Sequence, residues 1–160
     1  MKLDIVEATD EHILAMEQGI RDLDKQEIWA ATHLPVDKAL LDSNHPDYGE
    51  WSESFTALID GEVMAMFGVV CVHTGGPNGN IGMPWLIGTQ ALNRYPVTFV
   101  KTSKWVLEQL QETYQYLGNF VDCRYGGAMD WLELLGFELH NPEPVGPGGE
   151  LFSRFEWRAN

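Results

Sequence analysis

The sequence predicts one α/β domain built on a mixed, mostly antiparallel central sheet with helices on both faces. Its 160 residues fit a single domain, residues 1–160, and 44% of them are hydrophobic, which suffices for a substantial core. Segments of helical and strand periodicity alternate along the chain, with no internal repeat, linker or low-complexity stretch. This order favours a layered sheet with helices packed on both sides.

The first third is predicted to be one strand followed by helices. Residues 3–8 alternate as a strand does, and Thr9 then precedes two acidic residues, which is typical of a helix N-terminus. Apolar residues recur at helical spacing: Ile13, Met16, Ile20 and Leu23. We expect a second short helix over residues 24–31, a third that begins at Pro35, and a turn-rich loop over residues 44–49.

A β-hairpin is the clearest local signal in the chain. The apolar runs 55–59 and 62–72 are separated by Asp60-Gly61. Two-residue hairpin turns need positive φ at both central positions, and Asp-Gly supplies them. Residues 81–89 are predicted to form a further apolar strand.

The second half is predicted to begin with the longest helix. It is expected to start at Pro96 or Thr98 and to end near Leu117, with Gly118 as its C-cap. Four residues are expected on its inner face: Phe99, Val106, Leu107 and Leu110. Trp85 and Trp105 are also expected in the core. The remaining segments are a strand over 119–123, a helix over 126–135, a strand over 137–140, a loop over 141–149 and a strand over 151–157.

The charge and composition exclude several classes of protein. A formal net charge of −14 argues against nucleic-acid binding, because phosphate contacts need clustered Lys and Arg. No apolar run approaches the roughly 20 residues of a membrane span, and the N-terminus lacks a signal peptide's apolar stretch. We therefore expect a soluble, intracellular protein. Its dispersed acids are interpreted as a solvated surface, or alternatively as one that docks a basic partner or mimics DNA.

Two motifs resemble those of the GNAT (GCN5-related N-acetyltransferase) family. Residues 126–137 end in Leu-Gly-Phe and resemble the family's late helix-then-strand motif. Asp60-Gly61-Glu62, followed by an apolar strand, resembles its central hairpin. The resemblance covers essentially the whole chain and implies the GNAT fold.

Several segments further resemble the GNAT-like proteins that short-tailed bacteriophages encode among their structural genes. These segments are residues 24–30, 54–58, 66–69, 84–89, 117–122, 131–137 and 152–155. Members of that group are named acetyltransferases or internal virion proteins. The resemblance implies a protein of the infected bacterial cytoplasm or the phage virion, with phage structural or assembly proteins as partners. Since fold does not fix function, it leaves the activity open.

The family's cofactor loop is degraded in this sequence. Active GNAT enzymes hold the diphosphate of acetyl-CoA with a Gln/Arg-x-x-Gly-x-Gly/Ala loop at a helix N-terminus. The corresponding residues 90–98 contain no glycine, and Pro96 removes one N–H donor. If acetyl-CoA binds, the resemblance implies these contacts: Leu86, Ile87, Gly88, Thr89, Arg94, Thr98 and Asn119.

The catalytic residues are equally altered. The tyrosine that protonates the leaving thiolate in many GNAT enzymes is replaced by Leu132. Tyr125 is a candidate displaced acid, or an ordinary aromatic residue at a strand-to-helix turn. Asp122 is a candidate base, acting directly or through water, or a carboxylate that bonds to its own loop. The histidines are scattered without paired ligand spacing, so the sequence predicts no metal site.

Three functions remain open at this point, and whether the chain is an enzyme is not decided. The sequence favours a pseudoenzyme, a GNAT scaffold that binds other components of a phage particle or its assembly. The main alternative is an active N-acyltransferase that transfers an acetyl group from acetyl-CoA to an amine. A third is an early phage protein that blocks a host factor through its acidic surface.

Overall fold

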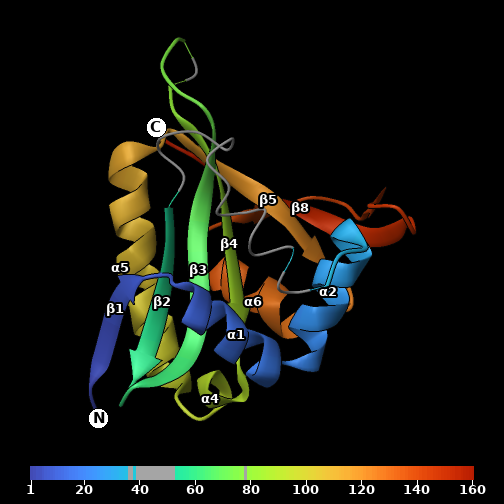
Figure 1. The fold of residues 1–160 in the computed structure, drawn as a ribbon. Helices are drawn as coiled ribbons and strands as arrows, with labels where there is room; N and C mark the ends of the chain where they lie inside the picture. The colour runs from blue at the N-terminus through green and yellow to red at the C-terminus, as the bar shows by residue number, and fades with distance from the viewer. Residues whose placement is uncertain (36–37, 39–52, 78) are drawn as a thin grey trace.

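An eight-stranded open sheet organises the molecule in the computed structural model, which describes residues 1–35, 38, 53–77 and 79–160 (Figure 1). The strand order is β1-β2-β3-β4-β5-β8-β6, with β7 paired to β8, and β4–β5 is the parallel pair. The strands are β1 (Leu3–Glu7), β2 (Glu53–Ile59), β3 (Glu62–His73), β4 (Ile81–Gly88), β5 (Tyr116–Asp122), β6 (Glu138–Leu139), β7 (Glu143–Val145) and β8 (Glu150–Arg158). The helices are α1 (Asp10–Gly19), α2 (Asp22–Thr32), α4 (Gln90–Asn93), α5 (Pro96–Thr113) and α6 (Gly126–Leu134). The predicted mixed, mostly antiparallel sheet is confirmed.

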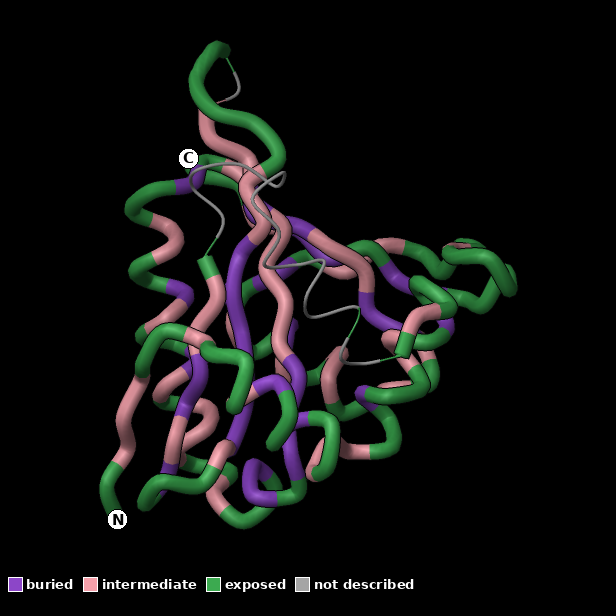
Figure 2. Tube along the Cα trace, in the orientation of Figure 1, coloured by how far each residue is buried: buried purple, intermediate pink, exposed green. Residues whose placement is uncertain are grey.

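Helices cover both faces of this sheet, as predicted. On one face, Ile13 and Met16 of α1 pack with Met66 and Ile87 of the central strands. The other face is covered by α5 and α6, whose buried residues form a second cluster with β3, β5 and β8. Buried residues accordingly occupy the middle of β3, from Met64 to Val69, whereas its ends are intermediate or exposed (Figure 2). Among the described residues, no helix is both long and apolar enough to cross a membrane.

Two local predictions are confirmed in detail. The Thr9 hydroxyl accepts a hydrogen bond from the His12 N–H at 3.2 Å, and His12 Nδ1 accepts one from the Thr9 N–H, which completes a capping box. Asp60 and Gly61 take φ values of 50° and 83° in the β2–β3 turn. Asp60 also accepts the Lys2 N–H at 2.8 Å, so the turn holds the start of β1.

The predicted end of the longest helix is wrong. α5 ends at Thr113, and residues 116 and 117 already belong to β5, so Gly118 lies inside a strand and not at a helix C-cap. Leu117 is fully buried and pairs with Trp157 of β8. The chain leaves the helix because the N–H groups of residues 115 and 116 donate to the Asn80 carbonyl at the start of β4.

Other differences concern faces and short elements. Trp105 is 53% exposed, because it lies opposite the buried face of α5, where Ser103 and Leu107 lie. Residues 90–93 form α4, and β7 lies inside the predicted loop 141–149, paired to β8. The helix predicted from Pro35 and the turns at 44–49 fall essentially outside the described residues.

Leu117 should carry a large share of the stability of the β5 region. Replacing Leu117 with Ala leaves a cavity under the sheet and should lower the free energy of unfolding by about 2–5 kcal/mol in urea titrations. Leu134→Ala, on the exposed side of α6, is the matched control and should cost less than about 1 kcal/mol. Equal losses in the two variants would contradict this assignment of Leu117 to the core.

Candidate functional site

The candidate site lies where β4 and β5 separate. These strands pair only at Ile81–Tyr116 and Gly82–Leu117 and then diverge, while β4 continues along β3 and β5 along β8. Beyond this point, the peptide groups that face the gap have no neighbouring strand. Buried backbone N–H and C=O groups need partners, so the gap must be filled by side chains or by a ligand.

Asn119 fills the narrow end of the gap. Its Nδ2 donates to the Pro84 carbonyl of β4 at 3.0 Å, and its Oδ1 accepts the Phe120 N–H of β5 at 2.8 Å. The side-chain amide therefore takes the place of an inter-strand peptide contact. Asn119, predicted as a cofactor contact, thus has two protein partners.

The wide end of the gap is filled by acidic side chains of α2. The Gly88 N–H donates to Asp24 Oδ2 at 3.0 Å, and the Gly88 carbonyl accepts the Arg21 N–H at 3.1 Å. On the opposite strand, the Asp122 N–H donates to Glu27 Oε2 at 3.0 Å. Arg21 Nε lies 2.6 Å from Asp24 Oδ2, and this ion pair is almost completely buried. The two carboxylates therefore cap one strand each.

One position between these caps is left open. The peptide groups of Pro84 and Gly88 face the gap, and side chains alternate with a period of two along a strand, so the groups of Leu86 face it too. Among the described residues, none donates to or accepts from the Leu86 backbone. Within the part of the chain that the structure describes, the N–H and C=O groups of Leu86 on β4 therefore face the gap without a partner.

A cavity of about 760 Å³ occupies this region and is lined from both faces of the sheet. Arg21, Asp24, Glu27 and Ile28 line it from α2, and α5 and α6 line it from the other face with mainly apolar side chains. Its volume is typical of sites for small molecules. Four of the residues predicted for the site line the cavity: Leu86, Ile87, Asn119 and Tyr125.

Glu27 is the site residue that the sequence did not reveal. Burial raises the pKa of Glu27 from its ordinary value of 4.5 to about 7, with a further increase from the charges of Asp24 and Asp122. The hydrogen bond from the Asp122 N–H and the charge of Arg21 act in the opposite direction. A carboxyl group with a pKa near neutrality is poised to take up and release protons. Nothing in the pattern of α2 marks this residue, since it sits among other charged side chains.

Asp122, the predicted base, is committed to its own loop. Burial would raise the pKa of its carboxyl group, but the hydrogen bonds and charge of Arg124 outweigh this effect and leave the pKa below its ordinary value. Both carboxylate oxygens contact the Arg124 guanidinium, at 2.6 to 3.1 Å, and Oδ1 also accepts the Arg124 N–H. This geometry matches the loop-bonding interpretation and suits a base poorly.

Tyr125, the predicted acid, lines the cavity. It lies at the N-cap of α6, and the Arg21 guanidinium stands 5.4 Å from the centre of its ring. Burial raises the pKa of Tyr125 to about 12, so the phenol keeps its proton at neutral pH. Leu132, at the position of the family's tyrosine, is buried in the core.

The cofactor loop is replaced by the short helix α4, whose N–H groups are used internally. The Ala91 N–H donates to the Thr89 hydroxyl at 3.2 Å, and the N–H groups of Leu92, Arg94 and Tyr95 donate to carbonyls two or three residues earlier. These donors point into the turn and not toward a phosphate. α4 therefore offers none of these four N–H groups to a diphosphate.

The remaining predicted cofactor contacts have protein partners. Thr89 Oγ1 donates to the carbonyl of Val63 or Met64, at 2.8 and 3.1 Å. Arg94 Nη2 lies 2.6 Å from Glu62 Oε2 in an exposed ion pair, which is worth at most about 1 kcal/mol. Ile87 packs into the core beneath α1, and Thr98 lies in the first turn of α5.

Comparisons with known proteins place the fold. No protein-family profile and no curated protein sequence matches the chain. Among solved structures, an N-acetyltransferase from Staphylococcus aureus is similar with a TM-score of 0.68 and 12% identity over 99% of each chain. A GCN5-related N-acetyltransferase from Kribbella flavida has a TM-score of 0.69 and 16% identity over 98% of each chain. A ribosomal-protein-alanine N-acetyltransferase from Brucella melitensis has a TM-score of 0.68 and 11% identity over 98% of this chain and 99% of its own.

The chain has the GNAT fold. At these identities the likeness shows the fold alone, and the resemblance to phage proteins gains no support from it. The sequence-based expectation of the fold is therefore confirmed, whereas the expected phage origin stays a prediction.

The raised pKa of Glu27 predicts a pH-dependent cost to stability. The folded protein holds a proton on Glu27 up to a pH of about 7, whereas the unfolded chain releases it near pH 4.5. Ionisation of Glu27 therefore favours the unfolded chain, and the protein loses stability as the pH rises from about 4.5 to about 7. Glu27→Gln keeps an acceptor for the Asp122 N–H and removes the titration. Relative to the wild type, it should gain about 1–3 kcal/mol of unfolding free energy between pH 5 and pH 8.

Urea unfolding at several pH values measures this difference. Glu17→Gln, on the exposed side of α1, is the control and should show the same pH dependence as the wild type. A constant difference between Glu27→Gln and the wild type across this pH range would contradict the raised pKa.

Proposed function

We propose that the chain is an N-acyltransferase that transfers an acyl group from a thioester to an amine in the gap between β4 and β5. The observation that carries this proposal is the open backbone position at Leu86, on the wall of a 760 Å³ cavity that Glu27 also lines. The GNAT fold is consistent with it. Fold alone does not establish it, because one fold hosts many functions.

The residues present fit one half of acetyl-CoA. The N–H and C=O groups of Leu86 would pair with an amide of the pantetheine arm, as a neighbouring strand would, and the apolar wall of the cavity would cover the arm. When bound, the thioester supplies the acyl group and a thiol as leaving group. The diphosphate half has no cradle in α4, since the N–H groups of residues 91, 92, 94 and 95 are already used.

Glu27 is the proposed proton acceptor for the attacking amine. The Asp122 N–H holds one carboxylate oxygen, Oε2, and thereby fixes the orientation of the group. The second oxygen remains able to accept a proton. With a pKa of about 7, a substantial fraction of Glu27 is ionised at neutral pH, which is the condition for an effective general base.

Tyr125 is the proposed proton donor to the leaving thiolate. Its raised pKa keeps it protonated at neutral pH, and the Arg21 guanidinium over its ring holds its position. Arg21 also pairs with Asp24, whose carboxylate accepts the Gly88 N–H, so the same side chain orients the acid and supports the cap at the end of β4.

A second candidate is the scaffold that the sequence favours: a catalytically degenerate GNAT protein that binds phage structural or assembly proteins in the virion or the infected cell. The specific observation in its favour is that Asp24 and Glu27 already occupy the backbone N–H groups of Gly88 and Asp122, and that α4 fills the cofactor loop. The phage context itself is supported only by the sequence resemblance.

Binding of thioesters tests the proposed function and separates the two candidates. Because the site grips the arm and not the diphosphate, acetyl-CoA and acetyl-pantetheine should bind with affinities that agree within about threefold, or about 0.7 kcal/mol. Isothermal titration calorimetry measures both affinities. The control is 3′,5′-ADP, the nucleotide part of CoA without the pantetheine arm, which should not bind. If neither thioester binds at concentrations near about 1 mM, the acyltransferase is wrong and the scaffold is favoured.

Turnover with a thioester and a primary amine should depend on Glu27. In the wild type kcat/KM should rise with pH through about 7, as Glu27 ionises. Glu27→Gln should lower kcat/KM by about 10²–10⁴-fold and remove this limb of the profile. Glu17→Gln should leave both the rate and the profile unchanged. A Glu27→Gln variant that retains the wild-type rate and pH limb would rule out Glu27 as the base.

A further inference from the structure

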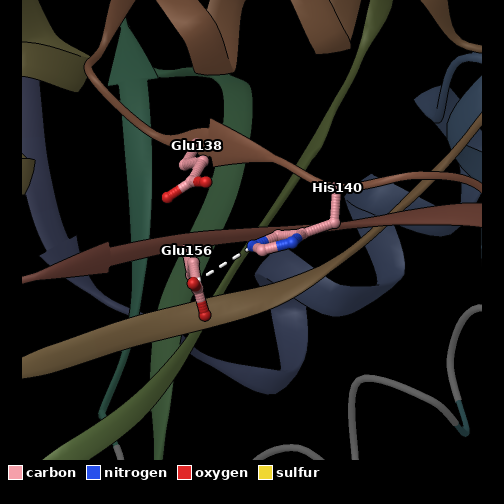
Figure 3. Close-up of side chains that lie close together, drawn as sticks. All are labelled: Glu138, His140 and Glu156. Carbon is pink, nitrogen blue, oxygen red and sulfur yellow. Dashed lines mark ion pairs between the residues drawn. The ribbon is translucent and has the colours of Figure 1, made fainter.

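Three side chains with metal-binding atoms gather at the β6–β8 edge of the sheet, away from the gap between β4 and β5. Glu138 and His140 come from β6 and the residue that follows it, and Glu156 comes from β8 (Figure 3). One donor atom from each lies within 4.8 Å of the others. Their sequence separations carry no recognisable spacing, and only the pairing of β6 with β8 brings them together.

The two carboxylates stand directly opposite one another. Glu138 and Glu156 are partners in the antiparallel β6–β8 register. Like charges at such positions destabilise a sheet, and the cost is larger for Glu156 because it is buried, with a side-chain exposure of 9%. A positive charge between the two side chains would offset this repulsion.

His140 points its ring nitrogen at the same place. Its Nε2 lies 3.1 Å from Glu156 Oε1, and apart from this contact the buried nitrogen has no partner among the described residues. His140 and Glu138 are two residues apart and therefore face the same side of the sheet. A neutral imidazole whose lone pair faces a carboxylate oxygen requires a proton or a metal ion between the two atoms, and neutral imidazole is a common metal ligand.

The other oxygen of Glu156 is already held. Oε2 accepts a hydrogen bond from the Tyr116 hydroxyl at 2.8 Å and lies 3.4 Å from Arg158 Nη2. The Arg158 guanidinium in turn stands 4.8 Å from the centre of the Tyr116 ring. These contacts orient the carboxylate and leave Oε1 directed at His140. Arg158 balances one of the two carboxylate charges, and one negative charge remains.

We propose that Glu138, His140 and Glu156 bind a divalent transition-metal ion, with Zn²⁺ as the best match. Zinc takes imidazole nitrogen and carboxylate oxygen as ligands at about 2.0–2.2 Å, and sites with three protein ligands are common. Ligand atoms around a tetrahedral zinc ion are about 3.4 Å apart, so donor atoms that now lie up to 4.8 Å from one another must come closer on binding. Glu138 is exposed, and rotation of its side chain supplies this closure. Tyr116 then supports the bound carboxylate from behind.

The ion would hold β6 against β8 at the edge of the sheet. β6 is short, and it connects α6 to the edge of the sheet. Phe137, just before β6, contacts Phe155 of β8 edge-to-face at 5.1 Å, and both rings line the cavity described above. Binding at the edge would therefore stabilise one wall of that cavity.

Zinc titration of the full chain, freed of any affinity tag and treated with a chelator, tests the proposal. Calorimetry should show one Zn²⁺ per chain, and zinc should raise the midpoint of thermal unfolding, because it binds the folded state only. Glu138→Gln should weaken binding by at least about tenfold and remove the thermal shift. Glu143→Gln removes the same charge from exposed β7 and should behave as the wild type.

Four outcomes would overturn the proposal. The first is no saturable heat in the wild type at zinc concentrations up to about 1 mM. The second is an affinity unchanged in Glu138→Gln, which would place the zinc elsewhere. The third is an equal loss in Glu143→Gln, which would reflect net charge alone. His140→Ala, with its fold checked by circular dichroism in the absence of zinc, should lose binding as Glu138→Gln does, and retention of binding would likewise contradict the site.

Discussion

The separation of β4 from β5 is the constraint on which the rest of the structure depends. Two parallel strands that pair at only two positions leave a row of buried peptide groups without partners, and each unsatisfied group would cost about 1–3 kcal/mol. Three side chains provide these partners: Asn119 of β5 at the narrow end, and Asp24 and Glu27 of α2 at the wide end. The position of α2 and the polarity of its buried face follow from this requirement.

Burial of the Asp24 and Glu27 carboxylates costs desolvation free energy, and this cost is offset differently at the two side chains. Asp24 is paired with Arg21 at 2.6 Å, so its charge is compensated where it lies. Among the residues that the structure describes, no cation pairs with Glu27 in this way, and burial raises its pKa to about 7. The group that satisfies the Asp122 N–H is thus also the one whose proton is most easily exchanged near neutral pH. The buried position in which Glu27 accepts the Asp122 N–H is therefore also the cause of its raised pKa.

Local signals in the sequence predicted the fold well, while the site depends on contacts that no local pattern encodes. The Asp60-Gly61 turn and the Thr9 cap are set by neighbouring residues, and both are as expected. α2 reverses the usual pattern, since Leu23 is 41% exposed and Asp24 is buried, because the partner of Asp24 is the Gly88 N–H, 64 residues away. The end of α5 was misplaced for a similar reason: Leu117 fits a helical repeat, but its burial is decided by β8.

The structural and chemical roles of Glu27 can be separated in principle. A carboxyl oxygen accepts the Asp122 N–H whether the group is ionised or neutral, so the cap on β5 survives protonation. Only the ionised form can take a proton from an amine. The fold therefore tolerates both states of Glu27, and its protonation can change during a reaction without opening the gap. The same cannot hold for Asp24, because its ion pair with the Arg21 guanidinium relies on its charge, and that guanidinium also stands over the ring of Tyr125.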